Sequence, residues 1–390
     1  MKVVYLADAP YPHTWRWVQH FARSGVECEV ISFRPAQIEG ARVHYVGGAE
    51  PLGKARYLIH ARRVRQLIES LQPDLLHALH LTSYGFLGAL SGVRPLVISV
   101  WGTDVLEAPR LTPFHGWLTR FALRRADAIT ATGLHLATET TRYAPRSKRV
   151  TVVPYGVDLD RFAPESVRGE PVEPRASRRP STSSGRTATA SAEGAPVVIG
   201  TAARLSPEKG IAYLIEAFAV LRRRFGERLT LRLAGEGPER QKLEALARRL
   251  GVGDAVDFRG WLEHEELPAF LRELDVFVLP STAEGFGVAA VEASATGLPV
   301  VATSVHGIPD VVRDSVTGLL VPAKDATALA TAIGRLVEDE GLRRRLGAAG
   351  REYVAQRYDW RRNAAQMELI YRRLLEGRDG SRHADLRMGA

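Results

Sequence analysis

Short runs of β-branched and apolar residues alternate with amphipathic helical segments along this chain, and the series occurs twice. In the first half the predicted strands are Val3–Ala7, Glu27–Phe33, Leu75–Ala78, Leu96–Val100, Ala128–Ala131 and Arg149–Val153, and the predicted helices are Thr14–Ser24, Lys54–Leu71 and Pro113–Arg125. In the second half the predicted strands are Val197–Ala202, Thr230–Ala234, Val276–Leu279 and Pro299–Thr303, and the predicted helices are Gly210–Arg224, Pro238–Leu250, Phe286–Ala295 and a helical end from Ala326 onward. Apolar strands separated by helices form parallel sheets that are covered on both faces. The fold class is therefore α/β.

Two such series predict two Rossmann-like, doubly wound domains that face each other across a cleft, with ligands at the carboxyl ends of the strands. The first domain is predicted at residues 1–163 and the second at 197–357. Residues 164–196 are rich in Pro, Ser, Thr, Gly and Arg and have almost no large apolar side chain, which predicts a disordered insertion. The alternative for this segment is an ordered loop that closes over substrate. Residues 358–377 are predicted to form a helix that crosses back to the first domain, and 378–390 a tail.

Composition excludes several classes of site. A single cysteine, Cys28, rules out an intramolecular disulfide framework and a four-cysteine zinc site. The formal net charge of +9 favours phosphorylated or polyanionic partners. Nucleic acid is not an expected partner, because the basic residues are scattered without interleaved aromatic residues. No apolar run approaches the length of a membrane span, so the protein is expected to be cytoplasmic or attached only to a membrane surface.

The segment from Ala203 to Gly210 follows a predicted strand and precedes a predicted helix. The first amides of that helix would point toward an anion at this place. Arg204 and Lys209 flank the segment and are suited to clamp a diphosphate, Arg204 through a planar fork and Lys209 as a point charge. A solvated surface pair is the alternative.

A second motif, Glu284–Ala293, follows the strand Val276–Leu279. Its two glycines permit close approach of the backbone to a ligand. The carboxylates of Glu284 and Glu292 are suited to accept hydrogen bonds from sugar hydroxyls. The alternative is a charge at a helix N-terminus for Glu284 and a surface position for Glu292.

Arg204…Lys209-Gly210 with Glu284-x7-Glu292 resembles the retaining glycosyltransferases of family 4, the glycosyl transferases group 1, which have the GT-B fold. The resemblance covers nearly the whole chain. It extends to further motifs, namely Val153–Asp158, Ala234–Pro238, Gly297–Ala302 and Gly318–Pro322.

The resemblance implies a role for individual residues. The implied donor site places the diphosphate on Arg204 and Lys209, the transferred sugar on Glu284, the ribose on Glu292, and further main-chain contacts at Gly235, Phe286, Gly287 and Val288. It also implies a UDP- or GDP-linked donor sugar, no cofactor and no divalent metal. Fixed cations would stabilise the departing nucleoside diphosphate.

The first domain, which should hold the acceptor, departs from the family pattern at two places. The segment Ala9–Trp15 has no glycine where many relatives carry a Gly-Gly loop. Trp101 stands where relatives frequently have a histidine, and an indole neither accepts nor shuttles a proton. Together with Glu284, Arg204 and Lys209, Asp104 is predicted to be catalytic. It is available to a donor or acceptor hydroxyl, and a helix N-cap is its alternative role.

Other residues of the first half have two interpretations each. His77 is expected to be buried and hydrogen-bonded, whereas His80 is a candidate for the cleft. His115 and Trp117 either line the acceptor pocket or pack on the surface. The helix Lys54–Leu71 combines an apolar stripe with several arginines, which suits an anionic lipid or a lipid-linked acceptor. A solvated helix over a core stripe is the alternative.

These observations predict a metal-independent, retaining glycosyltransferase that moves a sugar from a nucleotide diphosphate sugar to a hydroxyl of a glycan, lipid-linked or small-molecule acceptor. Cell-envelope polysaccharide synthesis and peripheral contact with the inner membrane, at its cytoplasmic face, are further expectations. A non-hydrolysing nucleotide-sugar epimerase or a phosphorylase on the same fold is one alternative. A non-catalytic sugar-nucleotide scaffold is the other.

Overall fold

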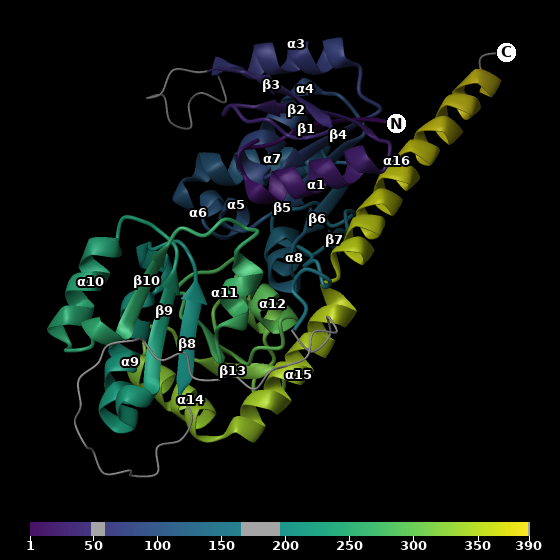
Figure 1. Ribbon diagram of the computed structural model, residues 1–390. Helices are drawn as coiled ribbons and strands as arrows, with labels where there is room; N and C mark the ends of the chain where they lie inside the picture. Colours follow the sequence, from purple (N-terminus) through teal and green to yellow (C-terminus); the bar gives the residue numbers. More distant parts are fainter. Residues whose placement is uncertain (48–58, 165–195, 389–390) are drawn as a thin grey trace, which may run out of the picture. The chain divides into compact units, whose positions relative to one another are not determined.

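The computed structural model describes residues 1–47, 59–164 and 196–388, with side chains described as far as residue 377 (Figure 1). The chain divides into two compact units: unit 1 is Met1–Gly156 with Trp360–Ala390, and unit 2 is Val157–Asp359. The predicted insertion 164–196 lies, apart from its two end residues, outside the described residues. The same holds for the part of the predicted helix Lys54–Leu71 that precedes residue 59.

Unit 1 is built on a seven-stranded parallel sheet in the order β3-β2-β1-β4-β5-β6-β7. Its strands are β1 (Lys2–Leu6), β2 (Glu27–Ser32), β3 (Ala41–Tyr45), β4 (Leu75–Leu79), β5 (Leu96–Val100), β6 (Ala128–Ala131) and β7 (Val150–Val152). Its helices are α1 (Pro12–Arg23), α3 (Ala61–Leu71), α4 (Phe86–Ser91), α5 (Thr103–Leu106), α6 (Ala108–Leu111), α7 (Pro113–Arg125), α8 (Leu134–Thr141) and α16 (Trp360–Met388), with a π-helix, η2, at Leu81–Gly85.

Unit 2 has a six-stranded parallel sheet in the order β10-β9-β8-β11-β12-β13. Its strands are β8 (Val197–Ala202), β9 (Leu229–Ala234), β10 (Val256–Gly260), β11 (Val276–Leu279), β12 (Val300–Thr303) and β13 (Gly318–Val321). Its α-helices are α9 (Ile211–Phe225), α10 (Arg240–Arg249), α11 (Leu267–Arg272), α12 (Val288–Ala295), α13 (Ile308–Val311), α14 (Ala326–Glu338) and α15 (Glu340–Arg357). Both sheets follow the 3-2-1-4-5-6 strand order of doubly wound folds.

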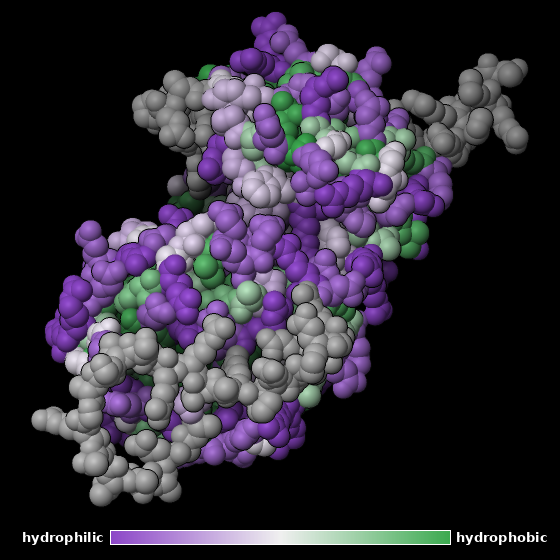
Figure 2. Space-filling model, in the orientation of Figure 1, coloured by the Kyte–Doolittle hydropathy of each residue, from purple (hydrophilic) through white to green (hydrophobic). Residues whose placement is uncertain are grey.

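The sheet of unit 1 is buried on both faces. Val4 and Leu6 of β1 enter one apolar cluster, whereas Val3 and Tyr5 enter another on the opposite face. Successive side chains of a strand point to opposite faces, so a strand between two helical layers must be apolar at every position. Burial of both faces therefore explains why the strands appear in the sequence as near-continuous apolar runs. On the face shown in Figure 2, hydrophilic residues predominate and hydrophobic residues form small separate groups.

Helix α16 completes one of the two cores of unit 1. Ala364, Met367 and Tyr371 recur at helical spacing and pack in the cluster that contains Val3 and Tyr5. The helix continues to Met388, through residues where the sequence suggested a tail.

The junction into unit 2 lies at residue 157, before the predicted boundary at 163. The reason is local packing: the Phe162 ring lies 5.9 Å from the His264 ring, and Arg351 donates a hydrogen bond to the carbonyl of Phe162. Residues 157–163 therefore belong with unit 2.

Two predicted helix starts are shifted for physical reasons. Helix α1 begins at Pro12, whose fixed φ and missing N–H suit the first helical position. Helix α12 begins at Val288 and not at Phe286, because Gly287 has φ +90° and cannot continue a right-handed helix.

Candidate functional site

The two segments of unit 2 that carry Arg204, Lys209 and Glu284 lie where the strand order of the sheet reverses. Strands β8 and β11 are neighbours at this switch point, and the sheet grows outward from them in both directions. The segment 203–210 follows β8, and 280–287 follows β11. Doubly wound sheets bind ligands in the crevice at the carboxyl ends of these two strands.

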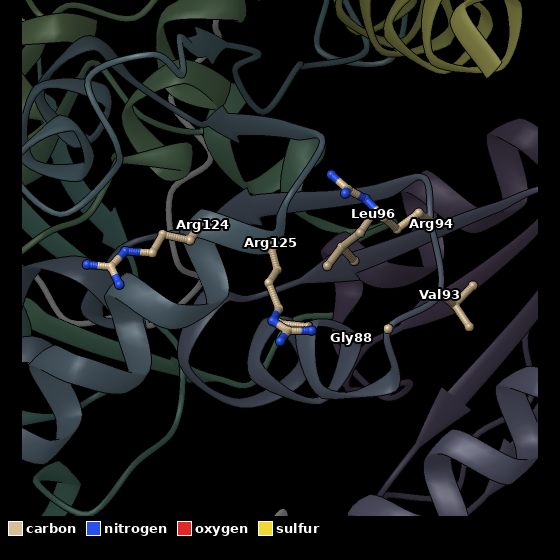
Figure 3. A pocket seen from close by; sticks show the side chains of 8 residues that line it. Gly88, Val93, Arg94, Leu96, Arg124 and Arg125 are labelled. Atoms are coloured by element: carbon tan, nitrogen blue, oxygen red, sulfur yellow. The ribbon is translucent and has the colours of Figure 1, made fainter. Parts of the chain in front are cut away.

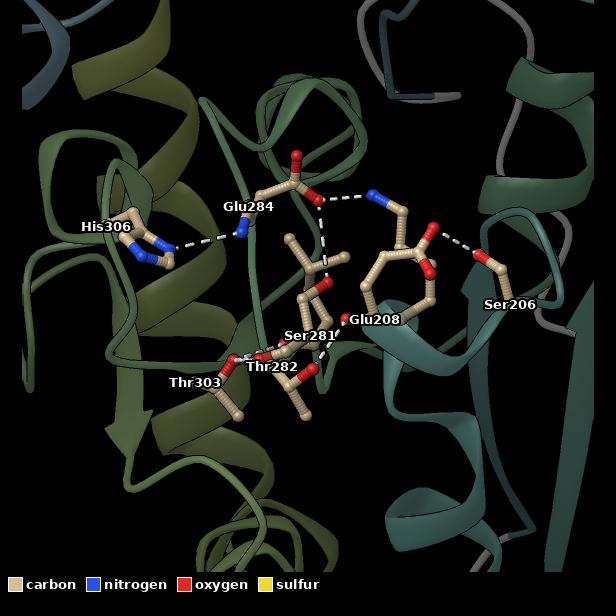
Figure 4. A network of polar contacts seen from close by, with 9 residues as sticks. Ser206, Glu208, Ser281, Thr282, Glu284, Thr303 and His306 are labelled. Carbon is tan, nitrogen blue, oxygen red and sulfur yellow. Dashed lines mark hydrogen bonds and ion pairs between the residues drawn. The ribbon is translucent and has the colours of Figure 1, made fainter. Parts of the chain in front are cut away.

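An ion pair joins the two segments. The Nζ of Lys209 lies 2.6 Å from Oε2 of Glu284, and the same oxygen accepts a longer hydrogen bond, 3.5 Å, from the hydroxyl of Ser281 (Figure 4). The side chains of Lys209 and Glu284 are 23% and 16% exposed, so the pair is partly withdrawn from water. Partial burial reduces screening, so the pair should hold its geometry better than a surface pair does.

Main-chain contacts hold the same two segments together independently of the ion pair. The carbonyl of Glu208 accepts hydrogen bonds from the amide of Thr282 at 2.7 Å and from its hydroxyl at 3.2 Å (Figure 4). The carboxylate of Glu208 accepts a hydrogen bond from the Ser206 hydroxyl at 2.5 Å. This bond is the main cause that lowers the pKa of Glu208.

Arg204 lies in the same segment but in a different environment. It is exposed, and among the described residues the structure records no hydrogen bond or ion pair of its side chain. Lys209 has three donor hydrogens and uses one on Glu284. Both cations therefore retain donors for an anionic ligand.

Two glycines allow the segments of unit 2 to approach closely. Gly210 has φ +63°, and a Cβ there would lie 2.1 Å from the carbonyl oxygen of Pro280. Gly235 has φ +137°, and a Cβ there would lie 1.9 Å from the carbonyl oxygen of Ala203. Only glycine fits at either place. The motif Ala234–Pro238, which contains Gly235, is thus packed directly against the segment that carries Arg204.

At the start of helix α12, main-chain N–H groups and not side chains are available to a ligand. Among the described residues, no hydrogen bond is recorded for the main-chain N–H of Gly287 or Val288. The Phe286 ring is buried, 5.4 Å from the ring of Tyr358, so only its backbone can meet a ligand. Glu292 lies further along the helix and is almost fully buried. Unpaired N–H groups at a helix start favour an anion.

Asp104 in unit 1 is fully buried and bonded to main chain. Its carboxylate accepts hydrogen bonds from the amides of Leu81 at 2.9 Å and Gly102 at 2.7 Å, and from that of Trp101 at 3.2 Å. The N-cap interpretation is wrong: the carboxylate turns back to residues that precede the helix, whose N-cap is Gly102. Asp104 instead joins the chain after β4 to the chain after β5.

An aromatic cluster occupies the carboxyl ends of β1, β5 and β7 in unit 1, and the sequence did not reveal it. The His13 ring stacks on that of Tyr155, with centroids 4.1 Å apart. Trp101 lies 6.0 Å from Tyr11 and 5.5 Å from Tyr155. The only signal was the frequency of aromatic residues directly after predicted strands. Trp101, which replaces the expected histidine, is therefore a member of a ring cluster.

His77 has a structural role. It is fully buried, with Nδ1 2.5 Å from the Tyr371 hydroxyl and Nε2 2.7 Å from the Ser99 hydroxyl. Burial lowers its pKa to about 3. This agrees with the expectation of a buried, hydrogen-bonded histidine. His80 is hydrogen-bonded to the hydroxyl of Ser83 at 3.1 Å.

The apolar stripe of helix α3 faces the core. Val64 and Ile68 are buried in a cluster of unit 1, so the stripe does not form a lipid-facing surface. Within the residues described, no helix is both long and apolar enough to cross a bilayer. Those residues also include no group of three or more His, Cys, Asp or Glu side chains placed to hold a metal ion.

Comparison with known proteins identifies the family to which the chain belongs. The profile of the family described as glycosyl transferases group 1 matches residues 187–353, and that of the glycosyl transferase 4-like family matches 2–133. A GDP-mannose-dependent alpha-(1-6)-phosphatidylinositol monomannoside mannosyltransferase of Mycolicibacterium smegmatis is 34% identical over 77% of this chain and 75% of its own. A D-inositol 3-phosphate glycosyltransferase of Xylanimonas cellulosilytica is 37% identical over 63% of this chain, which spans 57% of that relative.

Solved structures share the fold. A sucrose-phosphate synthase from Thermosynechococcus elongatus has a TM-score of 0.77 and 22% identity, with 97% of this chain and all of the other covered. Anabaena HepE, solved in complex with UDP-glucose, has a TM-score of 0.75 and 22% identity over 96% and 100% of the two chains. By fold, motifs and relatives, the chain belongs to the group 1 glycosyltransferases of family 4, enzymes with the GT-B fold.

Proposed function

We propose that the chain transfers a hexose from a nucleotide diphosphate sugar to a hydroxyl of an inositol-containing or lipid-linked glycan, with retention at the anomeric carbon and without a metal ion. The observation that carries the proposal is the Lys209–Glu284 pair, 2.6 Å long, across the two segments at the switch point of unit 2. The pair supports the proposal because it sets a cation that can bind phosphate beside a carboxylate that can accept hydrogen bonds from sugar hydroxyls.

The donor diphosphate would lie against Arg204, Lys209 and the first amides of α12. Arg204 is exposed and unpaired among the described residues, and Lys209 keeps two donor hydrogens. These fixed cations would carry out the charge stabilisation that a metal ion provides in other phosphate sites. Glu284 would accept hydrogen bonds from the transferred sugar, Glu292 would meet the ribose, and the turn at Gly235 would line the nucleotide side.

In the proposed step, the acceptor hydroxyl oxygen forms a bond to the anomeric carbon as the bond from that carbon to the β-phosphate oxygen breaks. The acceptor proton passes to the departing phosphate oxygen, so atoms and charge balance without a protein base. Attack and departure on the same face of the sugar give retention. Arg204 and Lys209 stabilise the negative charge that develops on the leaving diphosphate.

The relatives guide the choice of substrates. The mannosyltransferase that is 34% identical is named as GDP-mannose-dependent and acts on a phosphatidylinositol monomannoside. GDP-mannose is therefore the first donor to test and UDP-glucose the second. The acceptor would approach the carboxyl edge of the unit 1 sheet, where Tyr11 and Trp101 offer ring surface for stacking on a sugar. Asp104 would act there by fixing the loops after β4 and β5.

A transfer assay tests this function. The full chain is incubated with GDP-mannose or UDP-glucose and with inositol phosphate or phosphatidylinositol monomannoside, in the presence of EDTA. Mass spectrometry should show one added hexose, and NMR should show the anomeric configuration of the donor retained. Inversion would contradict the mechanism, and activity lost with EDTA and restored by Mg²⁺ would contradict metal independence.

The alternatives are not favoured by the relatives, which are named as glycosyltransferases. An epimerase would convert the donor without any acceptor, and a phosphorylase would consume inorganic phosphate. A scaffold would bind nucleotide and never turn over. The same assay, run without acceptor and then with phosphate, separates all three from a transferase.

A further inference from the structure

Helix α7 of unit 1 carries a row of aromatic rings on its outer side. Phe114 and Trp117 are 54% and 53% exposed, and their rings stack 6.0 Å apart at 15°. The Trp117 ring stacks in turn on Phe121, 5.4 Å away at 24°. The spacing i, i+3, i+7 keeps all three on one side of the helix. Phe121 itself is half-buried against the core, so the exposed part of the row is the stacked pair Phe114 and Trp117. Two large exposed rings stacked on each other form an apolar patch of the kind that marks an interaction site.

The opposite side of α7 already has its partner. Gly116, Thr119, Ala122 and Leu123 are buried against the rest of unit 1. The small residues Gly116, Thr119 and Ala122 let the helix lie close to the core, and the rings of Phe114 and Trp117 remain outside. Helix α3 shows the reverse arrangement, because its apolar stripe is buried. The exposed pair Phe114 and Trp117 is therefore separate from the core stripe of this helix.

The charged side chains of the α7 segment itself are all basic. Residues 108–126 contain four arginines and no Asp or Glu. Arg124 and Arg125 are exposed and make no ion pair among the described residues, whereas Arg110 is paired with Glu139 at 2.9 Å. The Arg125 guanidinium lies over the Phe121 ring, 4.8 Å from its centroid, so the basic end and the aromatic row are contiguous.

A shallow hollow lies at the basic end of the row. Arg94, Arg124 and Arg125 line it together with Gly88 and Leu96. In Figure 3 the side chain of Arg125 extends toward Gly88, and that of Arg124 extends away from it. Arg94 is paired with Asp127, which leaves the other two arginines available to an anion.

We propose that this surface, called here the α7 ridge (Phe114, Trp117, Phe121, Arg124 and Arg125), docks the enzyme on an anionic membrane. Trp and Phe rings favour the boundary between head groups and acyl chains, and unpaired arginines are attracted to anionic head groups. The inference deepens the proposed function, since a lipid-linked acceptor would then be met at the bilayer surface. It moves the membrane contact suggested by the sequence from α3 to α7.

Vesicle co-sedimentation tests the ridge without requiring turnover, so its failure is distinct from failure of the transferase proposal. The full chain is mixed with phosphatidylcholine vesicles that contain phosphatidylglycerol, or with phosphatidylcholine alone. We expect binding only to the anionic vesicles. The double change Phe114→Ala with Trp117→Ala should weaken it about tenfold, and Arg124→Gln with Arg125→Gln should weaken it and reduce its dependence on salt.

Trp261→Ala is the matched control, because Trp261 is an exposed tryptophan of unit 2, 64% exposed. It should leave vesicle binding unchanged. Calorimetric unfolding of each variant checks that the fold is intact. We expect it to be intact, because the substituted side chains are exposed. Equal binding of the Phe114/Trp117 double variant and wild type would overturn the proposal. A second result would also overturn it: wild-type dimers that form with increasing concentration and are abolished by the Phe114/Trp117 double change. The ridge would then bind a second copy of the chain.

Discussion

The two units order their strands in the same way, yet the loops at the carboxyl edges of their sheets carry different chemistry. In unit 2 the switch-point loops carry Lys209, Glu284 and glycines that force close packing. In unit 1 the corresponding edge carries the ring cluster of Tyr11, His13, Trp101 and Tyr155, with Asp104 buried beneath main chain. The scaffold decides where a ligand binds, and the loops decide which ligand it is.

This difference implies that changes in the two units should have separable effects. Changes in unit 2 should act on nucleotide binding and on the chemical step, whereas changes in unit 1 should act on acceptor handling and on the stability of unit 1.

Glu284→Ala should lower the turnover number by roughly 10²–10³-fold, because it removes the carboxylate proposed to hold the reacting sugar in place. Steady-state transfer rates with GDP-mannose measure the change. Glu284→Gln is the control, because it retains a hydrogen-bonding group but no charge. Its turnover number should lie between those of the wild type and Glu284→Ala. Turnover near the wild-type rate in the alanine variant would remove Glu284 from the site.

Asp104→Ala should destabilise unit 1 by about 3 kcal/mol, because it leaves buried amides of Leu81, Gly102 and Trp101 without an acceptor. Scanning calorimetry measures the loss, and Asp104→Asn, which keeps one oxygen acceptor, should lose less. Nucleotide diphosphate affinity should be unchanged, because it belongs to unit 2. A fall in that affinity would contradict the separation of the two units.

Lys209→Ala should weaken nucleotide diphosphate binding by about 1.5–3 kcal/mol, the value of a charge-assisted hydrogen bond. Isothermal titration with GDP and UDP, without metal, measures it. Lys242→Ala is the matched control, since Lys242 is an exposed lysine of the same unit paired with Glu239. Unchanged affinity in the Lys209 variant would exclude Lys209 from the diphosphate site.

Unit 1 should lose stability on mild acidification through His77. Burial lowers the pKa of His77 to about 3, below the ordinary value near 6.5, so the folded state stays neutral while the unfolded state takes up a proton. Stability is therefore complete above pH 6.5 and falls as the pH drops toward 3. Between pH 6.5 and 5.5 the expected loss from this group is about 1 kcal/mol.

Denaturant titrations at several pH values measure this slope. His77→Gln, which does not titrate, should be less stable than wild type near pH 7 and should have a flatter pH dependence in this window. An identical slope in the variant would assign the effect to other groups.

Local pattern was sufficient for much of the fold. Strands β5 and β11 run over the predicted residues, because their apolar runs have clear limits: Pro95 precedes β5, and Asp275 and Pro280 flank β11. Strand β3, by contrast, was not predicted. Its residues, Ala41–Tyr45, are only half buried and mix charged with apolar side chains, so no local signal separates them from a loop. Its position is decided by pairing with β2.

In the candidate site, too, local segments were predictable and contacts between distant residues were not. The site residues of unit 2 were predicted from two short segments, whereas the Lys209–Glu284 contact spans 75 positions of sequence and forms only because β8 and β11 are neighbours in the sheet. The hydrogen bond that Asp104 makes to Leu81 was not predicted, because Leu81 lies 23 residues away and follows a different strand. The ring cluster was missed for the same reason, since its members follow three separate strands. Contacts that are set by sheet order are not visible in local sequence.

The return of the chain to unit 1 has a consequence for synthesis on the ribosome. Helix α16 supplies Ala364, Met367 and Tyr371 to a core whose other members are translated hundreds of residues earlier. One apolar face of the nascent amino-terminal segment therefore stays uncovered until the residues after Trp360 leave the ribosome. Unit 2 is continuous in sequence, so it can fold before translation ends. A message or polypeptide interrupted before this helix would release a chain with an open core, which chaperones and proteases recognise.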